Sequence, residues 1–140
     1  MKIAIGTDHR GFLHKEYIIK NMPDYTWTDV GTYNQERTDY PIYAEKVLQL
    51  FLHKLVDYGV LLCSSGIGMA IAANRHKYVY SAVVWNEEVA RQAKAEDNIN
   101  VLVLPSDFVS PEQSISIITT WLSTEFKGNR YQERLDMIDL

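Results

Sequence analysis

The stretch LLCSSGIGMAIAAN, residues Leu61–Asn74, carries the strongest structural signal of the chain. An apolar run ends in Cys63, the only cysteine, and two serines follow it. Gly66 and Gly68 then alternate with apolar residues before a run of small side chains. Glycines let the backbone turn sharply, so that successive N–H groups can point at one anion. The pattern predicts a buried strand, a glycine turn and a helix.

Strands and helices alternate along the rest of the chain. The predicted strands are Lys2–Gly6, Tyr25–Gly31, Gly59–Cys63, Val79–Trp85 and Asn100–Leu104. The predicted helices are Gly11–Met22, Pro41 to about Asp57, one that starts at the Asn86 cap, Ser110 to about Phe126, and Arg130–Ile138. Short apolar strands separated by helices indicate a parallel sheet covered on both faces. We therefore expect an α/β fold: a single doubly wound, Rossmann-like domain over residues 1–140, with a five-stranded parallel sheet.

Composition narrows the class of protein. The chain has 140 residues, 46% hydrophobic and 23% charged, as in ordinary globular proteins. Its formal net charge of −4 gives no reason to expect nucleic-acid or membrane binding. One cysteine cannot form an internal disulfide and fits a reducing compartment. The segment Met1–Gly6 is too short and too quickly polar to be a signal peptide, and no apolar run approaches the length of a membrane span, so we expect a cytoplasmic protein.

The residues that follow each predicted strand indicate where a site would lie. In doubly wound sheets, ligands bind beyond the carboxyl ends of the strands. Polar and reactive side chains gather at these positions: Thr7, Asp8, His9, Thr32, Tyr33, the ERTDYP segment, Cys63–Gly68, Trp85, Asn86, Ser106 and Asp107. The sequence therefore predicts a site at this edge of the sheet.

The local chemistry of Cys63 has two interpretations. A thiol beside a helix N-terminus would have its thiolate favoured by the dipole and by nearby amides. A thiolate with an amide cradle suits abstraction of a proton next to a carbonyl, followed by stabilisation of the enediolate. Alternatively, Cys63 is a small core residue at the end of a buried strand. A redox role is disfavoured because no partner cysteine exists.

Several motifs in order resemble a known family. They are GTDHRG (6–11), GTYNQERTDYPIYA (31–44), CSSGIGMAIAAN (63–74), NVLVL (100–104) and GNRYQERLDMI (128–138). This set is similar to the type B ribose-5-phosphate isomerases and the galactose-6-phosphate isomerase subunits. The resemblance implies aldose–ketose isomerisation of a phosphorylated sugar through a cis-enediolate, with no metal or other cofactor. The most direct expectation is interconversion of ribose 5-phosphate and ribulose 5-phosphate, a step of the pentose phosphate pathway.

The resemblance also implies roles for individual residues. Cys63 would be the base, and Ser65 with the amides of Gly66, Ile67 and Gly68 would hold the oxyanion. The other implied residues are Asp8 for ring opening and the sugar hydroxyls, Tyr40 for the sugar, Asn74 for the glycine loop or a hydroxyl, and His9, Arg130 and Arg134 for the phosphate. Family members are homodimers, often paired into tetramers, whose active sites are built from both subunits.

Three positions depart from the family pattern. Glu96 stands where the family has the histidine that helps to open the sugar ring, and Asp97 stands where it has asparagine. We expect Glu96 to exchange a proton in place of that histidine and Asp97 to lie near the substrate. Asp107 replaces an arginine that helps to bind phosphate. If the Asp107 carboxylate faced the phosphate, it would weaken substrate binding.

Other interpretations remain open at the level of sequence. In place of the roles that the resemblance implies, His9 would only order a loop and Tyr40 would only pack. Arg130 and Arg134, which are one helical turn apart, would then form a solvated helix face. The alternative substrate to ribose 5-phosphate is a hexose 6-phosphate of the galactose or allose type. A divergent member would bind a sugar phosphate without turnover. A nucleotide-binding module is disfavoured because the third glycine of Gly-x-Gly-x-x-Gly is replaced by Ile71.

Overall fold

Five parallel strands form one sheet in the order β2-β1-β3-β5-β4. The computed structural model describes residues 1–140. The strands are β1 (Lys2–Thr7), β2 (Thr26–Asp29), β3 (Tyr58–Cys63), β4 (Ser81–Val83) and β5 (Val101–Pro105). This order reverses direction between β1 and β3, which creates a switch point at the carboxyl edge of the sheet.

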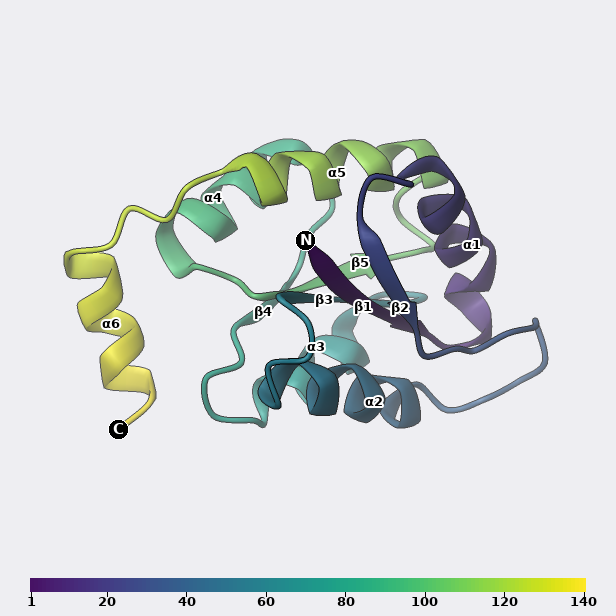
Figure 1. Cartoon of the computed structure of the whole chain (residues 1–140), viewed down its shortest axis with the longest axis horizontal. Helices are drawn as coiled ribbons and strands as arrows, with labels where there is room; N and C mark the ends of the chain where they lie inside the picture. Colours follow the sequence, from purple (N-terminus) through teal and green to yellow (C-terminus); the bar gives the residue numbers. More distant parts are fainter.

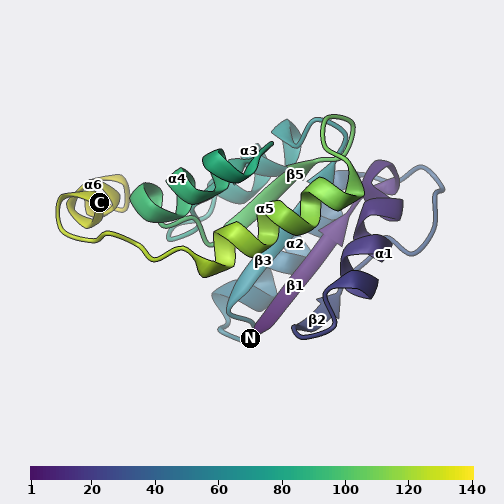
Figure 2. The same ribbon diagram turned by 90° about the horizontal axis from the view of Figure 1, so that it is seen from above.

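Helices cover both faces of the sheet. Figure 1 shows α1 (Phe12–Asn21), α4 (Glu87–Asp97) and α5 (Pro111–Ser123) on one face, and α2 (Tyr40–Leu52) and α3 (Ile67–Asn74) on the other. A short 3-10 turn, His9–Gly11, precedes α1. The last helix, α6 (Arg130–Ile138), lies outside these two layers, beyond α4, as Figure 2 shows. The predicted doubly wound α/β fold is confirmed.

Side chains of the central strands point to the two faces of the sheet in alternation and form two hydrophobic clusters. Ile3, Ile5 and Leu62 face the layer of α1, α4 and α5, where Trp121 packs. Ala4, Leu61, Val101 and Val103 face α2 and α3 and form the second cluster. All residues of β5 are buried, as expected for a strand covered on both faces. No helix has both the length and the apolar character that crossing a membrane would require.

Four predicted elements, two strands and two helices, are longer than the observed ones. The strands predicted over Tyr25–Gly31 and Val79–Trp85 shrink to β2 and β4, which are edge strands and pair on one side only. The helix predicted to reach Asp57 ends at Leu52, because Lys54 adopts a left-handed φ of 59° in the turn towards β3. The helix predicted to reach Phe126 ends at Ser123, because Thr124 is extended.

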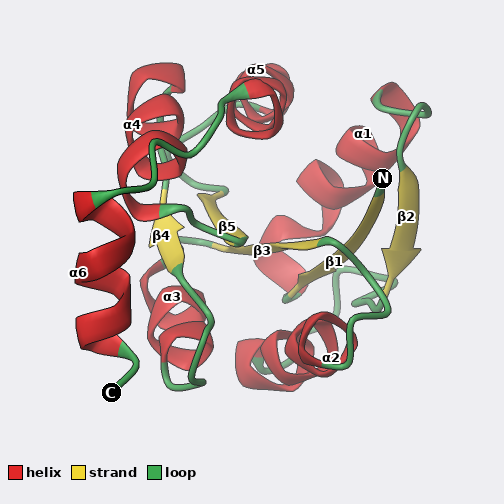
Figure 3. Cartoon of the chain, turned by 60° about the vertical axis from the view of Figure 1, so that its left-hand side comes forward, coloured by secondary structure: helices red, strands yellow, loops and turns green.

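The C-terminal helix is fastened at the amino edge of the sheet. The segment before α6 is held by the N–H of Lys127, which donates to the carbonyl of Ala95 near the end of α4. At the other end, Asp139 accepts hydrogen bonds from the N–H of Tyr78 and the hydroxyl of Tyr80, just before β4 begins. As Figure 3 shows, α6 therefore runs beside the β4 edge of the sheet, from the level of α4 to that of α3.

Candidate active site

The switch point brings the loops after β1 and β3 together. The register of these parallel strands sets Thr7 opposite Leu62, so the next residues, Asp8 and Cys63, are neighbours. Asp8 is 7% exposed and Cys63 5% exposed. A buried carboxylate and a buried thiol thus lie side by side at the carboxyl edge of the sheet, where ligands of doubly wound proteins bind. This confirms that the Asp8 and Cys63 loops meet at the carboxyl edge.

The environment of Cys63 acts on its thiol in two opposite ways. Burial raises the pKa of Cys63, and the nearby Asp8 charge raises it further. Hydrogen bonds from the backbone N–H groups of Met69, Gly66 and Ser65 favour the thiolate and lower the pKa. Burial outweighs them, so the pKa of Cys63 lies above its ordinary value. The expected amide cradle is present, and burial opposes its effect on the thiol.

The glycine turn needs both of its glycines. Gly66 caps α3 with a left-handed φ of 77°. A Cβ on Gly66 would lie 3.0 Å from Val103 and 3.1 Å from Val83. A Cβ on Gly68 would lie 2.5 Å from the ring of Tyr40, so that ring packs directly on the turn. The predicted sugar contact Tyr40 therefore stands at the mouth of the site.

Ser65 and the first turn of α3 offer hydrogen-bond donors. The Oγ of Ser65 accepts the N–H of Ile67 at 3.2 Å, so its own proton is available to another acceptor. The N–H groups of the first helical turn lack intrahelical partners. Met69 directs its N–H at the thiol. Gly68 lies between Ile67 and Met69 in the first turn of α3 and offers a further N–H. An oxyanion beside Cys63 would meet the Ser65 hydroxyl and the Gly68 amide.

Asp8 and His9 are both fixed by backbone donors. The N–H of Arg10 donates to Asp8 Oδ1 at 3.0 Å, which caps the turn before α1. The N–H of Thr38 donates to His9 Nδ1 at 3.2 Å. A neutral His9 therefore carries its proton on Nε2, which keeps a donor for a ligand. His9 both orders a loop and presents this nitrogen, so the two interpretations of His9 are compatible.

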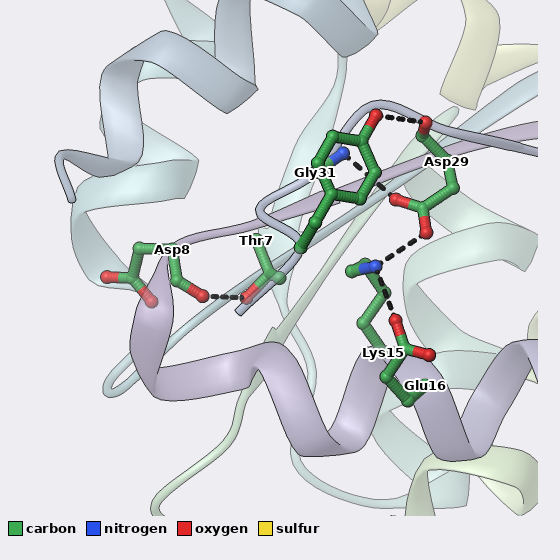
Figure 4. A network of polar contacts seen from close by, with 7 residues as sticks. Thr7, Asp8, Lys15, Glu16, Asp29 and Gly31 are labelled. Atoms are coloured by element: carbon green, nitrogen blue, oxygen red, sulfur yellow. Dashed lines mark hydrogen bonds and ion pairs between the residues drawn. The ribbon is translucent and has the colours of Figure 1, made fainter. Parts of the chain in front are cut away.

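A buried ion pair supports the loop after β1. Lys15 on α1, with a fully buried side chain, lies 2.6 Å from Asp29 Oδ2 and 2.9 Å from Glu16 Oε1. Asp29 Oδ1 accepts the N–H of Gly31, and the N–H of Thr7 donates to the carbonyl of Gly31. Figure 4 shows this network next to Asp8. The ion pair therefore holds the backbone from which Asp8 projects.

Ser106 is a positioning residue for which the sequence patterns predict no role. Its N–H and its Oγ both donate to the carbonyl of Cys63, at 2.9 and 3.1 Å. The Oγ also contacts the carbonyl of Arg10 at 3.3 Å. Ser106 thus joins the loops after β1, β3 and β5. Its place directly after the fifth strand was the only sequence signal that could have found it.

The remaining predicted residues lie at the opposite edge of the sheet. Helix α4 starts at the carboxyl edge and ends at the amino edge, so Glu96 and Asp97 lie far from Cys63 along the sheet. Arg130 and Arg134 belong to α6, whose contacts are with the end of α4 and the segment before β4. In one chain, these four side chains and Cys63 do not form one site.

The charged residues at the amino edge form their own cluster. Lys127 Nζ lies 3.5 Å from Glu96 Oε1. The guanidinium carbons of Arg130 and Arg134 lie 5.0 and 5.4 Å from the ring centre of Tyr131. A hydrogen bond to Tyr131 raises the pKa of Arg130. Both guanidinium groups therefore lie near the same aromatic ring.

Asn74 has a structural contact in place of the predicted one. It lies at the far end of α3 from the glycine turn. Its side chain donates to the carbonyl of Ser81 at 2.9 Å and accepts the N–H of Ser81 at 2.8 Å. Asn74 therefore fixes the start of β4, and the prediction that it supports the glycine turn finds no contact in this chain. No three His, Cys, Asp or Glu side chains are grouped to hold a metal ion.

Comparison with known proteins places the chain in a defined class, the sugar-phosphate isomerases. The model of the Ribose/Galactose Isomerase family matches residues 3–138. The chain is similar to ribose-5-phosphate isomerase B of Escherichia coli, with 35% identity over 139 residues, 98% of this chain and 93% of the relative.

Comparison with solved structures leads to the same class of protein. A ribose 5-phosphate isomerase from Thermotoga maritima matches with a TM-score of 0.96 and 41% identity, covering 99% of this chain and 97% of that one. Ribose-5-phosphate isomerase B from Mycoplasma genitalium with bound ribulose-5-phosphate matches with a TM-score of 0.91 and 35% identity, covering 98% and 93%. The chain belongs to the Ribose/Galactose Isomerase family.

Proposed function

We propose that this chain is an aldose–ketose isomerase that interconverts ribose 5-phosphate and ribulose 5-phosphate, with Cys63 as the base. The observation that carries the proposal is that Cys63 and Asp8 are neighbours at the carboxyl edge of the sheet, with the amides of the glycine turn directed at the thiol. Family membership supports the same reaction. Because the base would be a free thiol, the enzyme would work in a reducing compartment such as the cytoplasm.

The proposed reaction moves one proton between adjacent carbons. The Cys63 thiolate takes the proton from C2 of the open-chain aldose, and the C–H electron pair forms the C1–C2 double bond of an enediolate. The negative charge on O1 is held by the Ser65 hydroxyl and the Gly68 amide. The thiol then returns its proton to C1 while the proton on O2 is transferred to O1, which leaves a hydroxyl at C1 and the ketone at C2. Asp8, the neighbour of Cys63, would exchange protons with the sugar hydroxyls.

The proposed site is completed by a second copy of the chain. Arg130, Arg134, Glu96 and Asp97 lie at the amino edge, where they cannot reach a substrate held by Cys63 of their own chain. A two-fold dimer brings the amino edge of one protomer to the carboxyl edge of the other. The arginines would then hold the phosphate and Glu96, paired with Lys127, would accept a proton during ring opening.

The experiment that tests the proposal is proton exchange in heavy water. Ribose 5-phosphate is incubated with the protein, and NMR follows deuterium at C2 together with formation of ribulose 5-phosphate. We expect both with ribose 5-phosphate. Galactose 6-phosphate and allose 6-phosphate run in parallel, since the departure at Glu96 makes a hexose phosphate the nearest alternative. Exchange with a hexose phosphate alone, or binding without any exchange, would contradict the proposal.

A further inference from the structure

An ion pair that no part of the proposed mechanism uses bridges the loops after β1 and β5. Arg10 Nη2 lies 2.8 Å from Asp107 Oδ2, with the two side chains 54% and 40% exposed. An unpaired Asp107 carboxylate would weaken substrate binding only if it faced the phosphate. The pair shows that Asp107 is instead neutralised by a cation from another loop.

Both partners are attached to the backbone around Cys63. The N–H of Asp107 donates to the carbonyl of Ser64 at 3.0 Å. The N–H of Arg10 donates to Asp8, and its carbonyl contacts Ser106, which also bonds Cys63. The guanidinium is therefore anchored at the carboxyl edge, next to His9 in the chain.

The arginine retains most of its binding capacity. A guanidinium has five N–H donors in a planar fork, and Asp107 engages only Nη2. No other side chain accepts a hydrogen bond from it. The exposed donors match the oxygens of a phosphate, which a fork can bind at two points. A carboxylate on one side of the fork limits the rotation of the long side chain.

We propose that Arg10 is a phosphate-binding residue for the sugar phosphate and that Asp107 is the positioning residue that orients it. This proposal rests on the proposed function, because it names a further ligand of the same substrate. It makes the charge at position 107 a support for phosphate binding, since removing that charge would release Arg10 into solvent.

The test compares Arg10→Gln, Asp107→Asn and Asp107→Glu with the wild-type chain. Calorimetry gives the Kd of inorganic phosphate and of ribose 5-phosphate, and turnover gives kcat and KM. We expect Arg10→Gln to raise Kd and KM about 10- to 100-fold, as for loss of a charge-assisted contact. Asp107→Asn raises them about threefold with kcat unchanged, and Asp107→Glu restores them, because only orientation is lost and regained. Arg91→Gln, which breaks the exposed Arg91–Glu88 pair on α4, is the matched control and changes neither value.

Each outcome separates this inference from the proposed function. If the wild-type chain isomerises ribose 5-phosphate and Arg10→Gln keeps its KM and phosphate Kd, the inference is overturned while the function stands. If no sugar turns over but Arg10→Gln still weakens binding of ribose 5-phosphate, the inference stands and the function fails. Tighter phosphate binding by Asp107→Asn would overturn the positioning role.

Discussion

The carboxyl and amino edges of the sheet differ in how firmly their proposed functional residues are held. At the carboxyl edge, Asp8 and Cys63 are buried and tied by short backbone hydrogen bonds. At the amino edge, Arg130 and Arg134 project from a helix that is fastened mainly at its two ends. A base needs a fixed and sheltered position, whereas phosphate ligands need charge and reach. The difference supports the proposal that each chain carries two unlike half-sites and that a complete site joins one of each.

The largest expected effect is at the carboxyl edge. Cys63→Ala removes the proposed base, and we expect kcat to fall by about 10³-fold or more, since proton transfer by a positioned group accounts for 10²–10⁴-fold. Deuterium exchange at C2 is the measurement, with the melting temperature as a check on folding. Met69→Leu, in the first turn of α3, keeps the N–H that faces the thiol and is the control. Near wild-type exchange by Cys63→Ala would remove the thiol from the mechanism.

The second expected effect concerns the buried ion pair of Lys15, which supports the carboxyl edge. Asp29→Asn keeps an acceptor for Gly31 but removes the main counter-charge of the buried Lys15. We expect a loss of roughly 3 kcal/mol in the free energy of unfolding, because a buried charge is left without its best partner. Urea unfolding at fixed protein concentration measures it.

The matched control for this loss is Glu88→Gln, which breaks the exposed Arg91–Glu88 pair. Surface pairs contribute about 0–1 kcal/mol, so the control should cost less than Asp29→Asn. Equal losses for the two variants would mean that the Lys15 network does not stiffen the carboxyl edge.

The pH dependence gives a smaller effect, about tenfold per pH unit below the pKa of the base. Burial raises the pKa of Cys63 in the free chain, and only the thiolate can take a proton. We therefore expect kcat/KM to rise with pH through and above neutrality. The alkylation rate of Cys63 by iodoacetamide should rise along the same curve. An inflection in kcat/KM well below neutral pH would show that the amides, and any partner residues, outweigh burial.

The carboxyl edge was largely predictable from sequence, because strand ends and glycine turns are local signals. Asp8, Cys63 and Gly66 follow or end apolar runs, and topology alone then brings them together. The net direction of the Cys63 pKa was not predictable, since it depends on how deeply the fold buries the thiol.

The amino edge shows what sequence patterns leave out. The resemblance placed Arg130 and Arg134 in the phosphate site, and no local pattern revealed that they lie at the other end of the chain's own sheet. The Arg10–Asp107 pair joins residues of two distant loops, so position 107 by itself suggested repulsion. The role of Asn74 likewise depends on its partner Ser81, seven residues further along.

Mixing two inactive variants tests the central claim most directly. Cys63→Ala damages only the carboxyl half-site, and Arg134→Ala damages only the amino half-site. The two proteins are unfolded together, refolded at equal concentrations and assayed with ribose 5-phosphate. If sites join one half from each chain, half of the dimers are mixed and each holds one intact site, so activity should recover to about a quarter of wild type. If both half-sites act within one chain, no site in the mixture is intact. Activity no higher than the mean of the separate variants would contradict the account.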